Sequence, residues 1–283
     1  MINDMSNDIG GIIGVFDSGL GGLCAVREIL KIMPGEDIIY FGDTGRVPYG
    51  NKSYENIRKY GRQSVNFLLS KNVKIILVAC GTVSSVALDG LREQFPQVPI
   101  IGIIEGACDK AVQIAQSSQN KRVGIIGTQA TISKGSFTDY IRAIDPSCEV
   151  YSKSCPLFVP LVENGHIDDD ITKMAAESYL SELRELDLSS LILGCTHYPM
   201  IAAAIGEAIQ TNLIDAGAEA AHMLKKVLSS AESGTSSKTA KRKSGGKLEI
   251  FISDEGMNFS EIASGFLGFD IKSGISKIDI ENY

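Results

Sequence analysis

Two cysteines that follow apolar segments are the residues of this sequence best suited to chemistry. The apolar segment 191–193 ends at a glycine, and Cys195, Thr196 and His197 come next, so a thiol, a hydroxyl and an imidazole lie within three residues. A second apolar segment ends at Cys80. A thiolate acts as a base or a nucleophile, and a neighbouring imidazole can set its ionisation. The sequence therefore raises the question whether two thiols face one substrate.

The cysteines also have a purely structural interpretation. Cysteine is often buried as a small hydrophobic side chain, and Cys24 and Cys108 lie in helix-like segments that fit this role. Cys80 and Cys195 instead follow strand-like segments beside glycine and threonine, so the residues alone leave both interpretations open for them. The chain has no C-x-x-C pair and only three histidines, which argues against a metal site, including one built on Cys195 and His197.

Alternating strand and helix signals must position these groups. The alternation predicts an α/β fold with mainly parallel sheets, in two halves that each have their own sheet. Open α/β folds carry their ligand sites at strand ends, and the ends here present Asp17, Cys80, Thr128 and Cys195. Strands are expected within residues 10–22, 37–50, 74–80, 98–107, 122–132, 148–156, 189–199, 212–217 and 248–254.

Local signals place the ends of several elements. Ser53 is expected to cap a helix, and the acidic run 168–170 suits the first turn of another helix. Residues 229–247 are rich in serine, glycine and lysine, which predicts a flexible loop.

Two further segments lie beside the candidate groups. A helix is expected from Gly81 through about Phe95, and the strand within 98–107 is expected to end at Glu105. Residues 160–166 are expected to form a loop that carries Glu163.

A glycine-rich turn follows Asp17 and Ser18 and ends at Gly22. Such a turn could cradle a phosphate, but both the G-x-G-x-x-G spacing and a G-K-[ST] sequence are missing. Nucleotide binding is therefore not expected.

Composition excludes several classes of protein. The 283 residues suggest one or two domains, and 44% hydrophobic with 22% charged residues is ordinary globular usage. The net charge of −7, without a dominant basic patch, argues against non-specific binding to nucleic acid or to anionic membranes. The first residues lack the apolar core of a signal peptide, and no apolar run reaches the roughly 20 residues that span a bilayer. We expect a soluble, cytoplasmic protein.

Seven motifs in one order carry a family resemblance: VFDSGLGG, FGDTGRVPYG, VACGT, VGIIGT, PLVENG, LGCTHYP and LIDAG. Together they resemble the glutamate racemases of the cofactor-independent aspartate/glutamate racemase superfamily, over nearly the whole chain. The resemblance implies two similar α/β domains with the active site in the cleft between them. The first domain would comprise residues 1–103 and 213–283, and the second residues 104–212.

The resemblance also implies chemistry without pyridoxal phosphate, another cofactor or a metal. Inverting glutamate at Cα requires removing a proton from one face and returning one to the other. Cys80 would act on the D-enantiomer with help from Asp17, and Cys195 would act on the L-enantiomer with help from His197 and Glu163. The product, D-glutamate, would supply peptidoglycan synthesis.

Substrate binding would fall to hydroxyls and to a loop that offers backbone donors, which suit a zwitterion with a second carboxylate. These residues are Ser18, Pro48, Tyr49, Gly50, Gly81, Thr82, Thr128 and Thr196.

One position departs from the family pattern. The family usually has Cys-Asn-Thr, whereas this chain has Cys80-Gly81-Thr82. Backbone or water could replace the missing amide, specificity could have moved to another acidic amino acid, or activity could be weak. The first explanation is favoured, because every other glutamate motif is present, and it predicts that Gly81→Asn leaves or improves glutamate turnover.

Other functions stay open at this point. Gly81 alone supports an aspartate or other amino-acid racemase of the same superfamily. A ligand-binding protein that has lost turnover, or a one-cysteine decarboxylase or isomerase, would not need both Cys80 and Cys195. The expected partner is glutamate, and the resemblance allows a homodimer.

Overall fold

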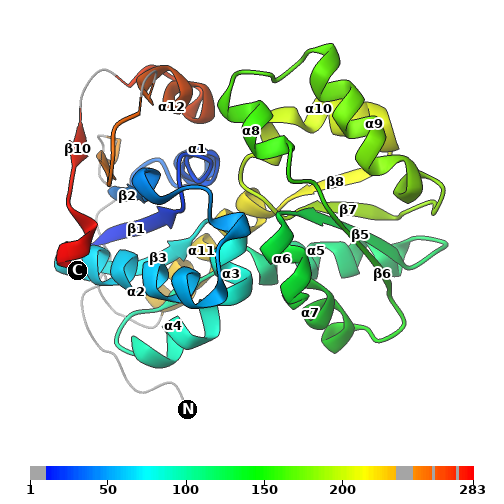
Figure 1. The fold of residues 1–283 in the computed structure, drawn as a ribbon. Coiled ribbons are helices and arrows are strands. Elements are labelled where there is room, and N and C mark those ends of the chain that lie inside the picture. Colours follow the sequence, from blue (N-terminus) through cyan, green and yellow to red (C-terminus); the bar gives the residue numbers. More distant parts are fainter. Residues whose placement is uncertain (1–10, 234–244, 257–258, 272–273) are drawn as a thin grey trace.

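Two parallel sheets organise the chain in the computed structural model, which describes residues 11–233, 245–256, 259–271 and 274–283. Figure 1 shows the sheets in two lobes, the first mainly blue, cyan and red and the second green and yellow. The predicted α/β class with mainly parallel sheets and two sheet-bearing halves is therefore confirmed.

The first sheet has the strand order β10-β9-β2-β1-β3-β4, and every neighbouring pair is parallel. Its central strands are almost continuous apolar runs, which suits a parallel sheet that is buried on both faces. Phe16 pairs with both Phe41 and Val78, so the segments that follow these three strands leave the sheet at one edge. The strands are β1 (Ile12–Asp17), β2 (Ile38–Gly42), β3 (Val73–Val78), β4 (Ile100–Ile101), β9 (Leu248–Ile252) and β10 (Ile275–Lys277).

The second sheet has the order β6-β5-β7-β8 and is also parallel. Ile126 pairs with Leu193, so Thr128 and Cys195 follow neighbouring strands at the same edge. The domain boundaries stay a prediction. The predicted boundary between residues 212 and 213 falls inside β8, and β8 pairs with β7 of this second sheet. The strands are β5 (Arg122–Gly127), β6 (Glu149–Ser154), β7 (Ser190–Leu193) and β8 (Asn212–Asp215).

Helices connect and cover the strands (Figure 1). Helix α11 contacts both α1 and α5, and a single buried apolar cluster runs from Val15 in the first sheet to Ile125 in the second. The α-helices are α1 (Leu23–Ile32), α2 (Tyr54–Ser70), α3 (Gly81–Val86), α4 (Leu88–Gln94), α5 (Ile104–Ser117), α6 (Gln129–Lys134), α7 (Ser136–Ile144), α8 (Phe158–Glu163), α9 (Asp170–Arg184), α10 (Ala202–Ile209), α11 (Ala216–Ser233) and α12 (Phe259–Leu267). Short 3-10 helices are η1 (Thr44–Arg46), η2 (Tyr49–Asn51), η3 (Tyr198–Ile201) and η4 (Ile280–Asn282).

Two helix starts agree with the sequence signals. The hydroxyl of Ser53 accepts a hydrogen bond from the Asn56 amide at 3.3 Å, as expected for the cap of α2. Of the acidic run 168–170, only Asp170 lies in the first turn of α9; Asp169 is the cap, and its carboxylate accepts a hydrogen bond from the Thr172 amide at 3.0 Å. In both cases a side-chain oxygen satisfies a backbone donor that has no partner within the helix.

Several expected boundaries are wrong. The helix expected from Gly81 to Phe95 is two helices that meet at Ala87, where the backbone leaves helical angles (φ −123°, ψ −16°). Strand β4 is only two residues long, and Glu105 lies in the first turn of α5 instead of at a strand end. Glu163 is the last residue of α8, not part of a loop.

The prediction places the start of the 229–247 loop too early in the chain. Helix α11 continues through Ser233, because Ala231 and Glu232 favour helix and the Ser230 hydroxyl bonds the Lys226 carbonyl within it. Residues 245–247 are neither helix nor strand, and residues 234–244 lie outside the described part of the chain.

The described residues contain neither a membrane-spanning helix nor a metal-binding cluster. None of the helices there combines the length and the apolar character needed to cross a bilayer. In the same part of the chain, no three His, Cys, Asp or Glu side chains gather in a way that could hold a metal ion.

Candidate active site

One cavity is lined by segments that follow strands of both sheets. The volume of this cavity is about 30 Å³, so it holds a few water molecules at most. Each half of the chain contributes one strand-terminal cysteine to the wall. The lining residues are Ser18, Val47, Pro48, Tyr49, Gly50, Cys80, Gly81, Thr82, Thr128, Val159, Glu163, Cys195, Thr196 and His197.

Cys80 comes two residues after β3 and directly before α3. Its thiol is buried and donates a hydrogen bond to the Ser18 hydroxyl, with an Sγ to Oγ distance of 3.4 Å. Burial, reinforced by the negative charge of Asp17, raises the pKa of the Cys80 thiol to about 12, although the Ser18 hydroxyl and the Val83 backbone, which can donate to the thiolate sulfur, act in the opposite direction. Cys80 is therefore a neutral thiol at neutral pH, suited to donating a proton.

Asp17 lies behind the cavity at the end of β1 and is fully buried. Its Oδ2 accepts hydrogen bonds from the amides of Gly19 and Gly22, both at 3.1 Å. Its Oδ1 is buried without a hydrogen-bond partner among the described residues. The amides that a phosphate cradle would need are thus occupied by the protein's own carboxylate, and this agrees with the sequence argument against nucleotide binding.

Cys195, His197 and Glu163 form a chain on the opposite wall. The Cys195 sulfur lies 3.9 Å from His197 Nδ1, and Glu163 Oε1 lies 3.0 Å from His197 Nε2. Because a carboxylate only accepts, Nε2 carries the proton of the bond to Glu163, and Nδ1 is directed to the sulfur. Glu163 reaches solvent with 35% of its side chain exposed, whereas His197 is buried.

The charge state of His197 follows from this chain. Burial alone would lower the pKa of His197, but hydrogen bonds with Cys195 and Glu163, reinforced by their charges, raise it to about 10. The imidazole is therefore protonated at neutral pH, and it places a positive charge beside the Cys195 sulfur.

Thr196 and His197 lie against the glycine-rich turn of the first half. A Cβ added at Gly21 would stand 2.4 Å from the Thr196 hydroxyl and 2.6 Å from His197 Nδ1. Real side chains do not tolerate such distances, so a glycine at position 21 lets the two halves approach at the site.

Hydroxyls and a short loop complete the cavity. The hydroxyl oxygens of Thr82 and Thr128 are 3.0 Å apart and join the two halves. The segment Val47–Gly50 forms one wall, and a Cβ at Gly50 would stand 2.7 Å from Thr128 Cβ. A small polar ligand in the cavity would thus face the backbone of this wall and four hydroxyls, those of Ser18, Thr82, Thr128 and Thr196.

Gly81 lies where the two cysteine loops meet. A Cβ at this position would stand 2.0 Å from the carbonyl oxygen of Gly194. The expectation that Gly81→Asn leaves or improves turnover conflicts with this contact, because an asparagine would displace the backbone that precedes Cys195.

All predicted site residues except Asp17 line the cavity. The sequence reasoning missed Val47 and Val159, which add apolar surface to its walls. No sequence signal distinguishes these valines from ordinary core residues, although Val47 lies inside the quoted motif FGDTGRVPYG. The other four cysteines, at positions 24, 108, 148 and 155, are buried free thiols outside the lining.

The known proteins that this chain resembles are racemases. The family model Asp/Glu/Hydantoin racemase matches residues 25–224. A glutamate racemase of Geobacter metallireducens is 40% identical over 258 residues, covering 90% of this chain and 92% of that protein. A glutamate racemase of Chlorobium phaeobacteroides is 42% identical over 261 residues, covering 92% and 93%. The crystal structure of a Francisella tularensis glutamate racemase in complex with D-glutamate superimposes with a TM-score of 0.88 at 34% identity, over 98% of this chain and 100% of that chain.

Proposed function

The chain belongs to the Asp/Glu/hydantoin racemase family, and from that premise we propose that it interconverts L- and D-glutamate with Cys80 and Cys195 as the two proton-transferring groups. The observation that carries the proposal is the placement of these two thiols, one from each half, in the wall of a single cavity. Inversion at Cα needs one group that removes a proton and a second group that supplies one to the opposite face.

Starting from L-glutamate, the Cys195 thiolate takes the Cα proton and becomes a thiol. The electron pair of the broken C–H bond is left on Cα and its carboxylate. Cys80 then gives its own proton to the opposite face of Cα, which yields D-glutamate and leaves Cys80 as a thiolate. The reverse reaction runs through the same two transfers, so no oxidant, reductant or cofactor enters the balance.

The electrostatics of the two walls support this assignment. His197 Nδ1 lies 3.9 Å from the Cys195 sulfur, so the protonated imidazole is placed to interact with that sulfur during the reaction. Burial and the charge of Asp17 keep Cys80 protonated. Cys80 is therefore suited to the proton-giving step of the L-to-D direction.

The amino-acid zwitterion would be held by the hydroxyls and backbone donors of the walls. Donors fixed around the substrate carboxylate would also stabilise the charge that develops on deprotonation. Because the cavity admits only a few waters, the two walls must move apart for substrate to enter. The D-glutamate produced would serve peptidoglycan synthesis, and homodimer formation stays a prediction.

The proposal is tested by incubating purified protein separately with L-glutamate, D-glutamate and L-aspartate and following the optical rotation. We expect both glutamate enantiomers to approach the racemate and L-aspartate to keep its rotation. Conversion of aspartate alone would contradict the assignment to glutamate. No change with any of the three, in folded protein, would favour a binding protein that has lost turnover.

A further inference from the structure

The cavity wall Val47–Gly50 is anchored to a buried carboxylate outside the site. Asp43 follows β2, and its side chain is fully buried. Its Oδ2 accepts a hydrogen bond from Arg46 Nε at 2.6 Å and another from the Tyr49 hydroxyl. Ser253, which follows β9, donates to Oδ1 at 2.7 Å. Asp43 thus binds the residue just before the wall and a residue within it.

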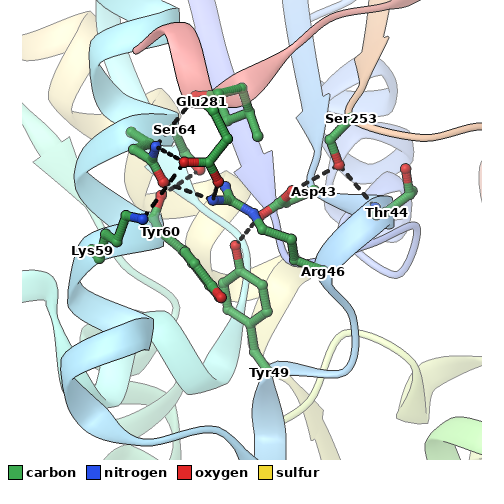
Figure 2. A network of polar contacts seen from close by, with 12 residues as sticks. Asp43, Thr44, Arg46, Tyr49, Lys59, Tyr60, Ser64, Ser253 and Glu281 are labelled. Carbon is green, nitrogen blue, oxygen red and sulfur yellow. Dashed lines mark hydrogen bonds and ion pairs between the residues drawn. The ribbon is translucent and has the colours of Figure 1, made fainter.

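Arg46 links Asp43 to residues of α2 and η4 (Figure 2). Its Nη1 donates to Gln63 Oε1 at 2.6 Å and to Glu281 Oε1 at 3.0 Å, and its guanidinium lies 4.0 Å from the centre of the Tyr60 ring. The Arg46 side chain is only 14% exposed. Its planar fork is therefore held from two sides, by Asp43 toward the cavity and by Glu281 toward the surface.

Glu281 belongs to η4, which is 235 residues away from Arg46 in the sequence. Gln63 on α2 donates to Glu281 Oε2 at 3.2 Å and to the Ile280 carbonyl at 3.4 Å. The Gln63 hydrogen bond, with the charges of Lys59 and Arg46, lowers the pKa of Glu281, so this carboxylate is ionised at neutral pH. Negative and positive groups therefore alternate along the network, from the Asp43 carboxylate through the Arg46 guanidinium to the Glu281 carboxylate.

Neither Arg46 nor Glu281 lines the cavity. We propose that Glu281, acting through Arg46 and Asp43, positions the Val47–Gly50 wall for substrate and thereby sets the affinity for the amino acid. Without Glu281, the guanidinium keeps Gln63 and Tyr60 but loses the carboxylate on its outer side, which weakens its fixed position beside Asp43. The Tyr49 anchor and the backbone donors of the wall then lose their fixed place opposite Thr128. This inference rests on the proposed function only for the identity of the substrate.

The test compares Glu281→Ala, Glu281→Gln and the matched control Lys59→Ala. Lys59 makes an exposed ion pair with Glu281 at 3.5 Å, and such exposed pairs contribute little. The first readout is hydrogen–deuterium exchange of residues 44–52, and the second is KM and kcat for L-glutamate. Because Glu281 is itself exposed, Glu281→Ala should fold.

Glu281→Ala should speed hydrogen–deuterium exchange in residues 44–52. It should also raise KM roughly tenfold, which is less than the roughly hundredfold loss caused by misplacing a group by about 1 Å, and it should leave kcat within about twofold of wild type. Glu281→Gln keeps an oxygen that can accept from Arg46 and should recover most of both effects. Lys59→Ala should match wild type.

Unchanged exchange in Glu281→Ala would overturn the proposal, as would a fall in kcat and melting temperature with an unchanged KM, which marks a merely structural role. The exchange readout needs no substrate. It therefore tests the positioning even if the wild-type protein fails to racemise glutamate, a result that would sink the proposed function alone.

Discussion

The α-carbon of Gly81 lies so close to the carbonyl oxygen of Gly194 that a Cβ at position 81 would stand 2.0 Å from it. The two residues directly neighbour Cys80 and Cys195. The contact therefore ties together the backbones that carry the two thiols, and it gives the missing asparagine at position 81 a steric explanation. Specificity for another amino acid is not needed to account for the glycine.

Gly81→Ala should lower the free energy of unfolding by about 1–3 kcal/mol, because overpacking forces the Gly194 backbone to move. Racemase activity should fall with it, and Gly81→Asn should be worse. Gly90→Ala is the matched control, since nothing lies within 4 Å of a Cβ there and alanine favours the α4 helix by up to about 1 kcal/mol. Urea unfolding and rate assays would check both, and wild-type stability in Gly81→Asn would contradict the contact.

Asp17→Asn should lower the pKa of Cys80, since removing a neighbouring negative charge makes the thiolate less costly. Asparagine keeps an oxygen for the amides of Gly19 and Gly22. The measurement is the pH dependence of iodoacetamide labelling, followed peptide by peptide. The Cys80 curve should move to lower pH, whereas Cys155, whose raised pKa owes nothing to Asp17, should not move. A Cys80 curve that stays in place would refute the electrostatic role.

His197→Asn should change the way stability depends on pH. The folded pKa of His197, about 10, lies above its ordinary value of 6.5. A raised pKa stabilises the fold fully below the unfolded value, and this contribution disappears as pH rises through the folded value. The stability difference between wild type and variant should therefore be largest below about pH 6.5 and shrink toward pH 10. A difference that rises with pH up to about 6.5 and then stays constant to pH 10 in urea titrations would show that His197 is buried as the neutral form.

Thr82→Val and Thr128→Val should not be additive. Their hydroxyls are 3.0 Å apart and join the two halves. Each single change removes this bond from the partner hydroxyl, which is buried in Thr82 and half-buried in Thr128, where the bonds to Thr131 remain. A double-mutant cycle in urea should give a coupling of about 0.5–1.5 kcal/mol. Strict additivity would mean that this hydrogen bond contributes nothing to holding the halves together.

Much of the site could be predicted from sequence because it depends on local order. Apolar runs that end at Cys80, Thr128 and Cys195 define strand ends, and parallel strands bring their ends to one edge. The pairing of the two edges across one cavity was implied only by the family resemblance, since strand patterns do not specify how separate sheets face each other.

Other features depend on contacts between distant residues. Nothing in the local sequence shows that Gly81 meets Gly194 or that Glu281 reaches Arg46 across 235 positions. Glu163 lies in the segment 160–166 that the sequence predicts as a loop, but the apolar residues before it form α8 and bury Phe158 and Val162. The burial of these apolar side chains, which the local sequence does not show, thus explains why the segment that carries Glu163 is a helix.

The central claim, that two thiols invert one carbon, is tested most directly in D₂O. Four proteins would each be incubated with L-glutamate: wild type, Cys80→Ser, Cys195→Ser and the control Cys148→Ser. Cys148 is a buried cysteine outside the cavity. Chiral separation and mass spectrometry would follow D-glutamate and its Cα deuterium. We predict deuterated D-glutamate from wild type and Cys148→Ser, and at least about a hundredfold loss in both other variants. Wild-type racemisation by either Cys80→Ser or Cys195→Ser would contradict the two-thiol account.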